Sequence, residues 1–307
     1  MPSGVLLGLA TAVSWGTSDF IARFAIKTSG SVRALLGVQF WGAILLTILL
    51  FLARDWGHLF DGSGWQPWAW GVVAGTINTC AMLALYRAFE IGKMAVVAPI
   101  SASYPALTVI LSTLSGERFS LYRALGILAA FAGVLLVAGG EAPHSTSTSS
   151  NEKAHSVRPN TSHGQRSALR QNGILCAAAA ALGFGVLFWL LGKRIIPSAG
   201  ALATVWMIRL TGTAITLTIL LARKIPLRIP NKRTNAQLYC MGFFDTAAFA
   251  LSNLGMRIEQ VAIISLLGSL YGAVTVAFAS IFLRERMAPL QWSGIAAIFI
   301  GIILMNT

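Results

Sequence analysis

The stretch GERFSLYRALGILAAFAG, residues 116–133, has a counterpart 168 positions later in RERMAPLQWSGIAAIFIG, residues 284–301. In both stretches a glutamate beside arginine is followed nine residues later by one glycine and sixteen residues later by another. The first set is Glu117, Gly126 and Gly133, and the second is Glu285, Gly294 and Gly301. A repeated unit in an apolar chain is typical of transport machinery, in which two similar halves move around a shared site.

Composition places this repeat in a lipid bilayer. Apolar residues make up 56% of the 307 residues and charged residues only 11%, whereas a soluble domain carries about 25% charged residues. The mean hydropathy is +0.72. The apolar residues fall in blocks of about 20, the length of a helix that crosses ~30 Å of hydrocarbon. The short alternating segments of a membrane β-barrel are absent from the sequence.

The apolar blocks predict ten membrane spans, five in each half. These spans are 4–24, 34–53, 67–88, 94–114, 122–140, 173–192, 202–222, 236–256, 262–283 and 290–305. Sixteen basic residues lie in the loops after the odd-numbered spans and six after the even-numbered spans, which predicts that both termini are outside the cytoplasm. Because five is an odd number, the second half must enter the membrane in the opposite orientation. The predicted fold is an all-α membrane protein with ten transmembrane helices in two inverted five-helix repeats.

One polar segment separates the two repeats. It is rich in serine and threonine and has almost no apolar residues, so it is predicted to be a disordered linker. The predicted organisation is therefore a first repeat at 1–140, the linker at 141–171 and a second repeat at 172–307. The first apolar block lacks a basic region before it and is interpreted as a membrane helix, not as a signal peptide.

Other classes of function are disfavoured by what the sequence lacks. The net charge is +13, but the basic residues are scattered among short loops, so membrane topology explains them better than a nucleic-acid partner. One histidine lies in a loop and three in the linker, so no catalytic or metal-binding set falls within the spans. No phosphate-binding glycine-rich loop occurs. The sequence therefore predicts neither an enzyme nor a cofactor or metal site.

The repeats also correspond at their beginnings. Trp15-Gly16 lies in the first span, and Phe184-Gly185 lies at the matching place in the sixth. Together with Gly-Glu-Arg after the fourth span, Arg-Glu-Arg after the ninth and the paired glycines, these motifs resemble the EamA branch of the drug/metabolite transporter superfamily. The resemblance covers residues 4–140 and 172–305.

The resemblance implies a ten-helix carrier of the inner membrane that moves small metabolites, often outward, through a central cavity. The chain departs from the family pattern in the ninth span, where Tyr271-Gly272 stands near the position at which the family often has proline.

Charged residues inside the predicted spans are candidates for function. A charge at the bilayer centre costs roughly 2.5–3.5 kcal/mol and faces a partner or a wet cavity. Asp19 lies four residues before Arg23, which predicts a local ion pair, and Arg209 could pair with Asp245 on the neighbouring helix. These charges either complete structural ion pairs or contact an ionic substrate. A desolvated carboxyl group can also carry a coupling proton.

Proline and glycine interrupt two matching spans. Pro99 and Pro105 deprive the fourth span of helical hydrogen bonds, and Gly268 and Gly272 loosen the ninth at similar depth. Interrupted helices in matching positions point to a transporter site, with kinks for packing as the alternative. The candidate substrate-binding residues are Trp15, Asn78, Ser101, Tyr104, Arg209, Asn253 and Tyr271.

Together these features predict a secondary transporter that exports a small metabolite such as an amino acid, by alternating access through a central cavity. One alternative is a proton-coupled exporter of toxic amphipathic compounds. A channel is less favoured, because Asp19 aligns with Phe188 and Asp245 aligns with no acid, so the symmetry of equivalent groups is missing. A membrane enzyme is less favoured because the spans hold no catalytic set. The expected partners are a small-molecule substrate and the bilayer of the cell membrane, with no nucleic acid. Homodimer formation is left open.

Overall fold

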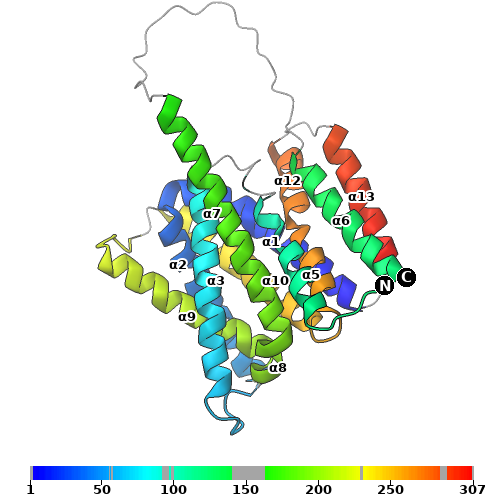
Figure 1. Cartoon of the computed structure of the whole chain (residues 1–307). Helices are drawn as coiled ribbons and strands as arrows, with labels where there is room; N and C mark the ends of the chain where they lie inside the picture. The colour runs from blue at the N-terminus through cyan, green and yellow to red at the C-terminus, as the bar shows by residue number, and fades with distance from the viewer. Residues whose placement is uncertain are drawn as a thin grey trace, which may run out of the picture.

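The protein is a helical bundle in the computed structural model, which describes residues 3–54, 56, 58–91, 97, 100–139, 163–228, 231–283 and 289–305 (Figure 1). These residues contain helices and connecting turns and no strand. In chain order the helices are α1 (Ser3–Ser29), α2 (Ser31–Ala53), α3 (Gln66–Ile91), α5 (Tyr104–Leu114), α6 (Leu121–Gly139), α7 (His163–Leu190), the π-helix η1 (Leu191–Ile195), α8 (Ile196–Ala199), α9 (Ala201–Ala222), α10 (Lys232–Gly255), α11 (Val261–Ser269), α12 (Tyr271–Leu283) and α13 (Pro289–Met305).

Several of these helices are long and apolar enough to cross a membrane. Within the described ranges five segments meet that condition: Ser3–Ser29, Ser31–Ala53, Gln66–Ile91, Asn172–Ala199 and Ala201–Ala222. Four shorter apolar helical segments accompany them: Ile100–Leu114, Leu121–Gly133, Val261–Thr275 and Trp292–Gly301. The all-helical fold and its apolar helices are those of a multi-pass integral membrane protein.

Helices from the two halves of the chain pack against each other throughout the bundle. α1 lies along α10, α7 lies along α3, and α2 contacts both α9 and α10. α6 and α13 lie side by side at one edge (Figure 1). That contact is close, because a Cβ atom added to Gly133 would lie 2.6 Å from the carbonyl oxygen of Gly294. Small residues allow such approaches in lipid, where packing drives helix association.

The predicted fourth and ninth spans are both broken. In the ninth, α11 ends at Ser269 and α12 begins at Tyr271. In the fourth, a short helical segment ends before Ser103 and α5 begins at Tyr104. The first turn of α5 contains Pro105, where the missing N–H breaks no helical hydrogen bond. Pro99, the other predicted kink residue, lies outside the described residues.

The boundary predicted for the linker differs from the structure. Because α7 begins at His163, residues 163–171 are helical, although the sequence placed them in a disordered segment. The sequence GQRSALRQ at 164–171 is rich in good helix formers, and it extends a helix that packing in the bundle already stabilises. The rest of the predicted linker, 141–162, falls outside the described part of the chain, as does Glu285.

Candidate functional site

A cavity of about 40 Å³ lies among helices of both halves, with room for about three water molecules. Its walls come from α1, α3, α5, α7, α10 and α12. The lining residues are Trp15, Asp19, Met82, Leu85, Tyr104, Phe184, Phe188, Asp245, Phe249 and Tyr271. Five of them were predicted from the sequence as substrate-binding or coupling residues: Trp15, Asp19, Tyr104, Asp245 and Tyr271.

Aromatic rings form a continuous wall of this cavity. The Trp15 ring meets those of Phe249 and Phe188 edge to face, with centroid distances of 5.2 and 5.6 Å. Phe188 in turn stacks on Tyr104 at 5.0 Å and on Phe249 at 6.0 Å. Contacts of this kind hold the rings in fixed orientations beyond what burial alone would do.

The two cavity tyrosines occupy matching places in the two halves. Tyr104 is the first residue of α5 and Tyr271 is the first residue of α12, so each follows the break in its span. The Tyr104 hydroxyl donates to the carbonyl oxygen of Ser265 at 2.9 Å, and the Tyr271 hydroxyl lies 3.1 Å from the Ser101 hydroxyl. Each hydroxyl is therefore hydrogen-bonded to the opposite half of the chain, and the ring of each tyrosine lines the cavity.

The predicted partnership of Arg209 and Asp245 is present in the structure. The two side chains are 0% and 5% exposed, and Arg209 Nη2 lies 2.7 Å from Asp245 Oδ2. Arg209 Nη1 also donates to Oε1 of Gln39 at 2.9 Å, and the guanidinium carbon is 5.1 Å from the ring centroid of Phe249. Arg209 itself is not part of the cavity wall. It lies behind Asp245 and neutralises it.

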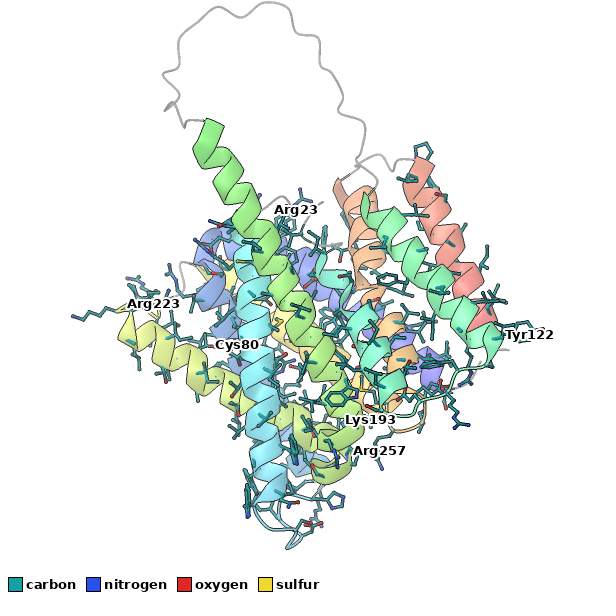
Figure 2. All side chains as sticks on the ribbon, viewed as in Figure 1. Arg23, Cys80, Tyr122, Lys193, Arg223 and Arg257 are labelled. Atoms are coloured by element: carbon teal, nitrogen blue, oxygen red, sulfur yellow. The ribbon has the colours of Figure 1, made fainter. Side chains whose placement is uncertain are left out.

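Asp19, in contrast, faces the cavity without such a partner. It is partly exposed, and within the described residues it accepts no hydrogen bond and forms no ion pair. Asp245 lies on the wall of the same cavity. Arg23 lies one turn farther along α1, near the upper end of the bundle in Figure 2, and its predicted pairing with Asp19 stays a prediction.

Comparison with protein families places this architecture among known transporters. The model of the EamA-like transporter family matches residues 2–139 and, a second time, residues 171–307. The chain belongs to the EamA-like transporter family. This family is part of the drug/metabolite transporter superfamily, and its members are membrane transporters of small molecules, not enzymes.

Two individual proteins are similar to this EamA-like chain, one over less than half of it and one over nearly all of it. An uncharacterized protein of Methanocaldococcus jannaschii is 27% identical over 138 residues, which are 45% of this chain and 97% of that protein. A protein of known crystal structure matches with a TM-score of 0.72 and 18% identity, over 98% of this chain and 96% of its own. The second likeness shows a shared fold alone.

The remaining predicted residues of this EamA-like protein lie outside the cavity wall. Asn253 donates to the carbonyl oxygen of Ala201 at 3.1 Å and so ties α10 to α9. Gly268 lies behind the wall, where an added Cβ would be 3.0 Å from the Trp15 ring. A Cβ atom added to Gly272 would lie 3.9 Å from its nearest neighbour, the methyl group of Ala102. Asn78 is fully buried, and neither polar atom of its side chain has a hydrogen-bond partner among the described residues.

Sequence reasoning missed the phenylalanines and Gln39, although the repeat marks Phe184 and Gln39 as equivalents of Trp15 and Arg209. Phe184 stands at the position of Trp15, 169 residues on. A local offset of 167 aligns GTINT at 75–79 with GFFDT at 242–246, which makes Asn78 the equivalent of Asp245. Alignment of Gly42 with Gly212 likewise makes Gln39 the equivalent of Arg209.

Proposed function

We propose that this EamA-like chain is a secondary transporter that exports a small metabolite, such as an amino acid, by alternating access. The cavity that both halves enclose carries this proposal, because its tyrosines begin the helical segments that follow the two breaks. Broken helices around a shared site are the common plan of secondary transporters. The export direction rests on family analogy.

We further propose ten membrane spans in two inverted repeats. Reciprocal contacts support this arrangement. Thr275 donates to the carbonyl oxygen of Gly16 at 3.3 Å, and Thr108 donates to the carbonyl oxygen of Gly185 at 3.1 Å. Thr275 is the equivalent of Thr108, 167 positions earlier, and Gly185 is the equivalent of Gly16, 169 positions earlier. Each contact is therefore the other with the two halves exchanged, as a twofold relation between the halves would produce.

A second reciprocal pair of contacts supports the same relation. An added Cβ on Gly37 would meet Leu238, and one on Gly71 would meet Met207. Since Gly37 and Met207 are 170 positions apart and Gly71 and Leu238 are 167 apart, α2 meets α10 as α9 meets α3.

Ion pairs between the halves would hold the lower end of the bundle closed in this conformation. Lys193 in η1 lies 3.0 Å from Glu117, and Arg123 in α6 lies 3.4 Å from Glu259. Lys193 is near the lower end in Figure 2. Glu117, the repeated glutamate of the first half, would therefore be part of a gate. Opening of that face would break both ion pairs.

A proton-coupled exporter is the second candidate, favoured by Asp19, which has no hydrogen-bond or ion-pair partner among the described residues. In either case the protein is expected in the cell membrane, with both termini outside the cytoplasm. A cysteine placed at Ser149 in a cysteine-free background should then resist an impermeant thiol reagent on intact cells. Ready labelling of sealed cells would reverse this orientation.

Flux in proteoliposomes tests the transport proposal. The purified chain should exchange at least one member of a panel of labelled amino acids and amines, and empty liposomes give the background. An imposed pH gradient separates the two candidates, since it would drive net flux only in the proton-coupled exporter. A folded protein that exchanges no panel member would contradict the proposal.

A further inference from the structure

We infer that the cavity binds a small organic cation, an amine or a quaternary ammonium ion, between the Asp19 carboxylate and the surrounding aromatic rings. The inference rests on the proposed transport function, because it names the substrate class of the same cavity. It depends on three properties of the wall: its acidic side chains, its aromatic rings and its small number of free donors.

The ionisable side chains of the wall are acidic. The only ionisable side chains among the lining residues, apart from the two tyrosines, are Asp19 and Asp245, and none is basic. Asp245 is neutralised by Arg209, which is fully buried behind it. One carboxylate is therefore left to face the cavity at membrane depth, where a charge requires a partner. A bound cation supplies that partner, whereas an anion would face the carboxylate.

The rings of the wall are suited to the same ligand. Aromatic faces attract a cation that lies within about 6 Å of the ring centroid, and most strongly when water is excluded. The cluster already stabilises one cation in this way, since the Arg209 guanidinium lies 5.1 Å from the Phe249 centroid. On the cavity side lie the rings of Trp15 and Phe188. Phe188 is stacked on Tyr104 and Phe249, so it offers a face to a second cation once these rings separate.

Free hydrogen-bond donors, of which an anion or a sugar would need several, are limited to the indole N–H of Trp15, the only side-chain N–H among the lining residues. The Tyr104 hydroxyl is used by a backbone carbonyl, and the Tyr271 hydroxyl is paired with Ser101. A quaternary ammonium ion needs no donor. At about 40 Å³ the cavity is too small for such an ion, so the rings must separate when it binds. Both tyrosines begin helical segments after a break, which allows that movement.

Isosteric ligands test the inference directly. Choline, the neutral alcohol 3,3-dimethylbutan-1-ol and the anion 3,3-dimethylbutanoate share one branched body and differ in charge. Binding to the purified full-length protein is measured by calorimetry and by ligand-dependent thermal stabilisation. We expect choline to bind about tenfold or more tightly than the alcohol, and the anion to bind least. Equal binding of choline and the alcohol, tighter binding of the anion, or no binding of any of the three would overturn the inference.

Paired variants locate the binding groups. Asp19→Asn should reduce the ratio of the affinities for choline and for the alcohol about tenfold, and Asp19→Glu should leave this ratio unchanged. The matched control is Asp61→Asn. Hydrogen bonds with Ser63 and His58 lower the pKa of Asp61 to about 2, so this change also removes one ionised carboxylate, but in the loop between α2 and α3.

A second pair of variants tests the rings. Phe188→Leu should weaken choline binding severalfold, whereas Phe243→Leu, on an exposed part of α10 against Phe244, should leave it unchanged. Unfolding curves without ligand verify that each variant is folded. A preference for choline that survives both Asp19→Asn and Phe188→Leu would place the cation elsewhere and overturn the inference.

Flux measurements distinguish this inference from the transport proposal. Choline that binds with the expected charge preference but is not moved across proteoliposomes would leave the cation site standing and count against transport. If the protein exchanges an amino acid but does not prefer the cationic ligand, the transport proposal stands and the cation site is contradicted.

Discussion

The two halves of the molecule place different side chains at equivalent points of equivalent helices. The first half has Gln39 on α2 and Asn78 on α3, both neutral amides. The second half has Arg209 on α9 and Asp245 on α10, a buried ion pair. Asp19 of the first half corresponds in turn to Phe188 of the second. The helix arrangement is thus repeated while the buried charges are not. The packing of the helices therefore does not determine which charged side chains they carry.

The largest expected effect comes from giving the second half the neutral residue of the first. Asp245→Asn leaves Arg209 buried without its carboxylate, which should cost about 3–5 kcal/mol of stability. The double variant Arg209→Gln with Asp245→Asn reproduces the amide pair of the first half and should recover most of that loss. Thermal unfolding of the purified proteins in detergent measures both. A double variant no more stable than the single one would show that the halves are not interchangeable here.

The next effect tests whether the backbone contacts of the halves are equivalent. A Cβ on Gly16 would lie 3.0 Å from the carbonyl oxygen of Tyr271, and one on Gly185 would lie 3.0 Å from that of Tyr104. Gly16→Ala and Gly185→Ala should therefore each cost about 1–3 kcal/mol through overpacking. Gly272→Ala, with 3.9 Å of clearance, is the control and should change little. Very unequal losses at Gly16 and Gly185, in the same unfolding assay, would argue against matched packing.

A smaller effect is expected from the tyrosine hydroxyls. Tyr104→Phe and Tyr271→Phe each remove one hydrogen bond between the halves and keep the ring. Each should lower the unfolding free energy by about 1 kcal/mol. Denaturation of the two variants and their double gives the comparison, and additive losses are expected for bonds that act independently. No loss in either variant would mean that these hydroxyls do not hold the halves together.

Asp19→Asn should have the smallest effect on stability. Asp19 forms no ion pair within the described residues, so Asp19→Asn leaves no basic side chain without its counter-ion. The variant should therefore unfold at nearly the wild-type temperature. Flux through proteoliposomes should nevertheless be strongly reduced. A variant that loses stability as Asp245→Asn does would indicate a structural ion pair in place of a ligand-binding carboxylate.

The sequence predicted the features that membrane physics makes conspicuous. Charged residues are rare in an apolar chain, so Arg209 and Asp245 were identified, and their pairing is confirmed. The break in the ninth span was predicted near Gly268 and Gly272, and it lies between them at Leu270. These signals are visible because lipid penalises each of them.

Phe188 and Phe249 carried no comparable signal. In a soluble helix an apolar stripe marks the buried face, but in a bilayer both the lipid-facing and the buried faces are apolar. Periodicity therefore does not reveal which phenylalanines line a cavity. Gln39 was missed for a related reason, because its role depends on a contact with Arg209 from a segment 170 residues away.

The hydrogen bond from Arg209 to Gln39 has a consequence for ancestry. The two residues occupy the same position in their respective halves, and they touch each other. In a protein assembled from two identical copies of one repeat, a residue at such a self-contact must meet its own type. Arginine would then face arginine, and two buried like charges would repel each other at short range. Duplication followed by fusion into one chain removes that restriction, because each copy can then mutate alone. An arginine at this position is a residue that two identical copies would not tolerate.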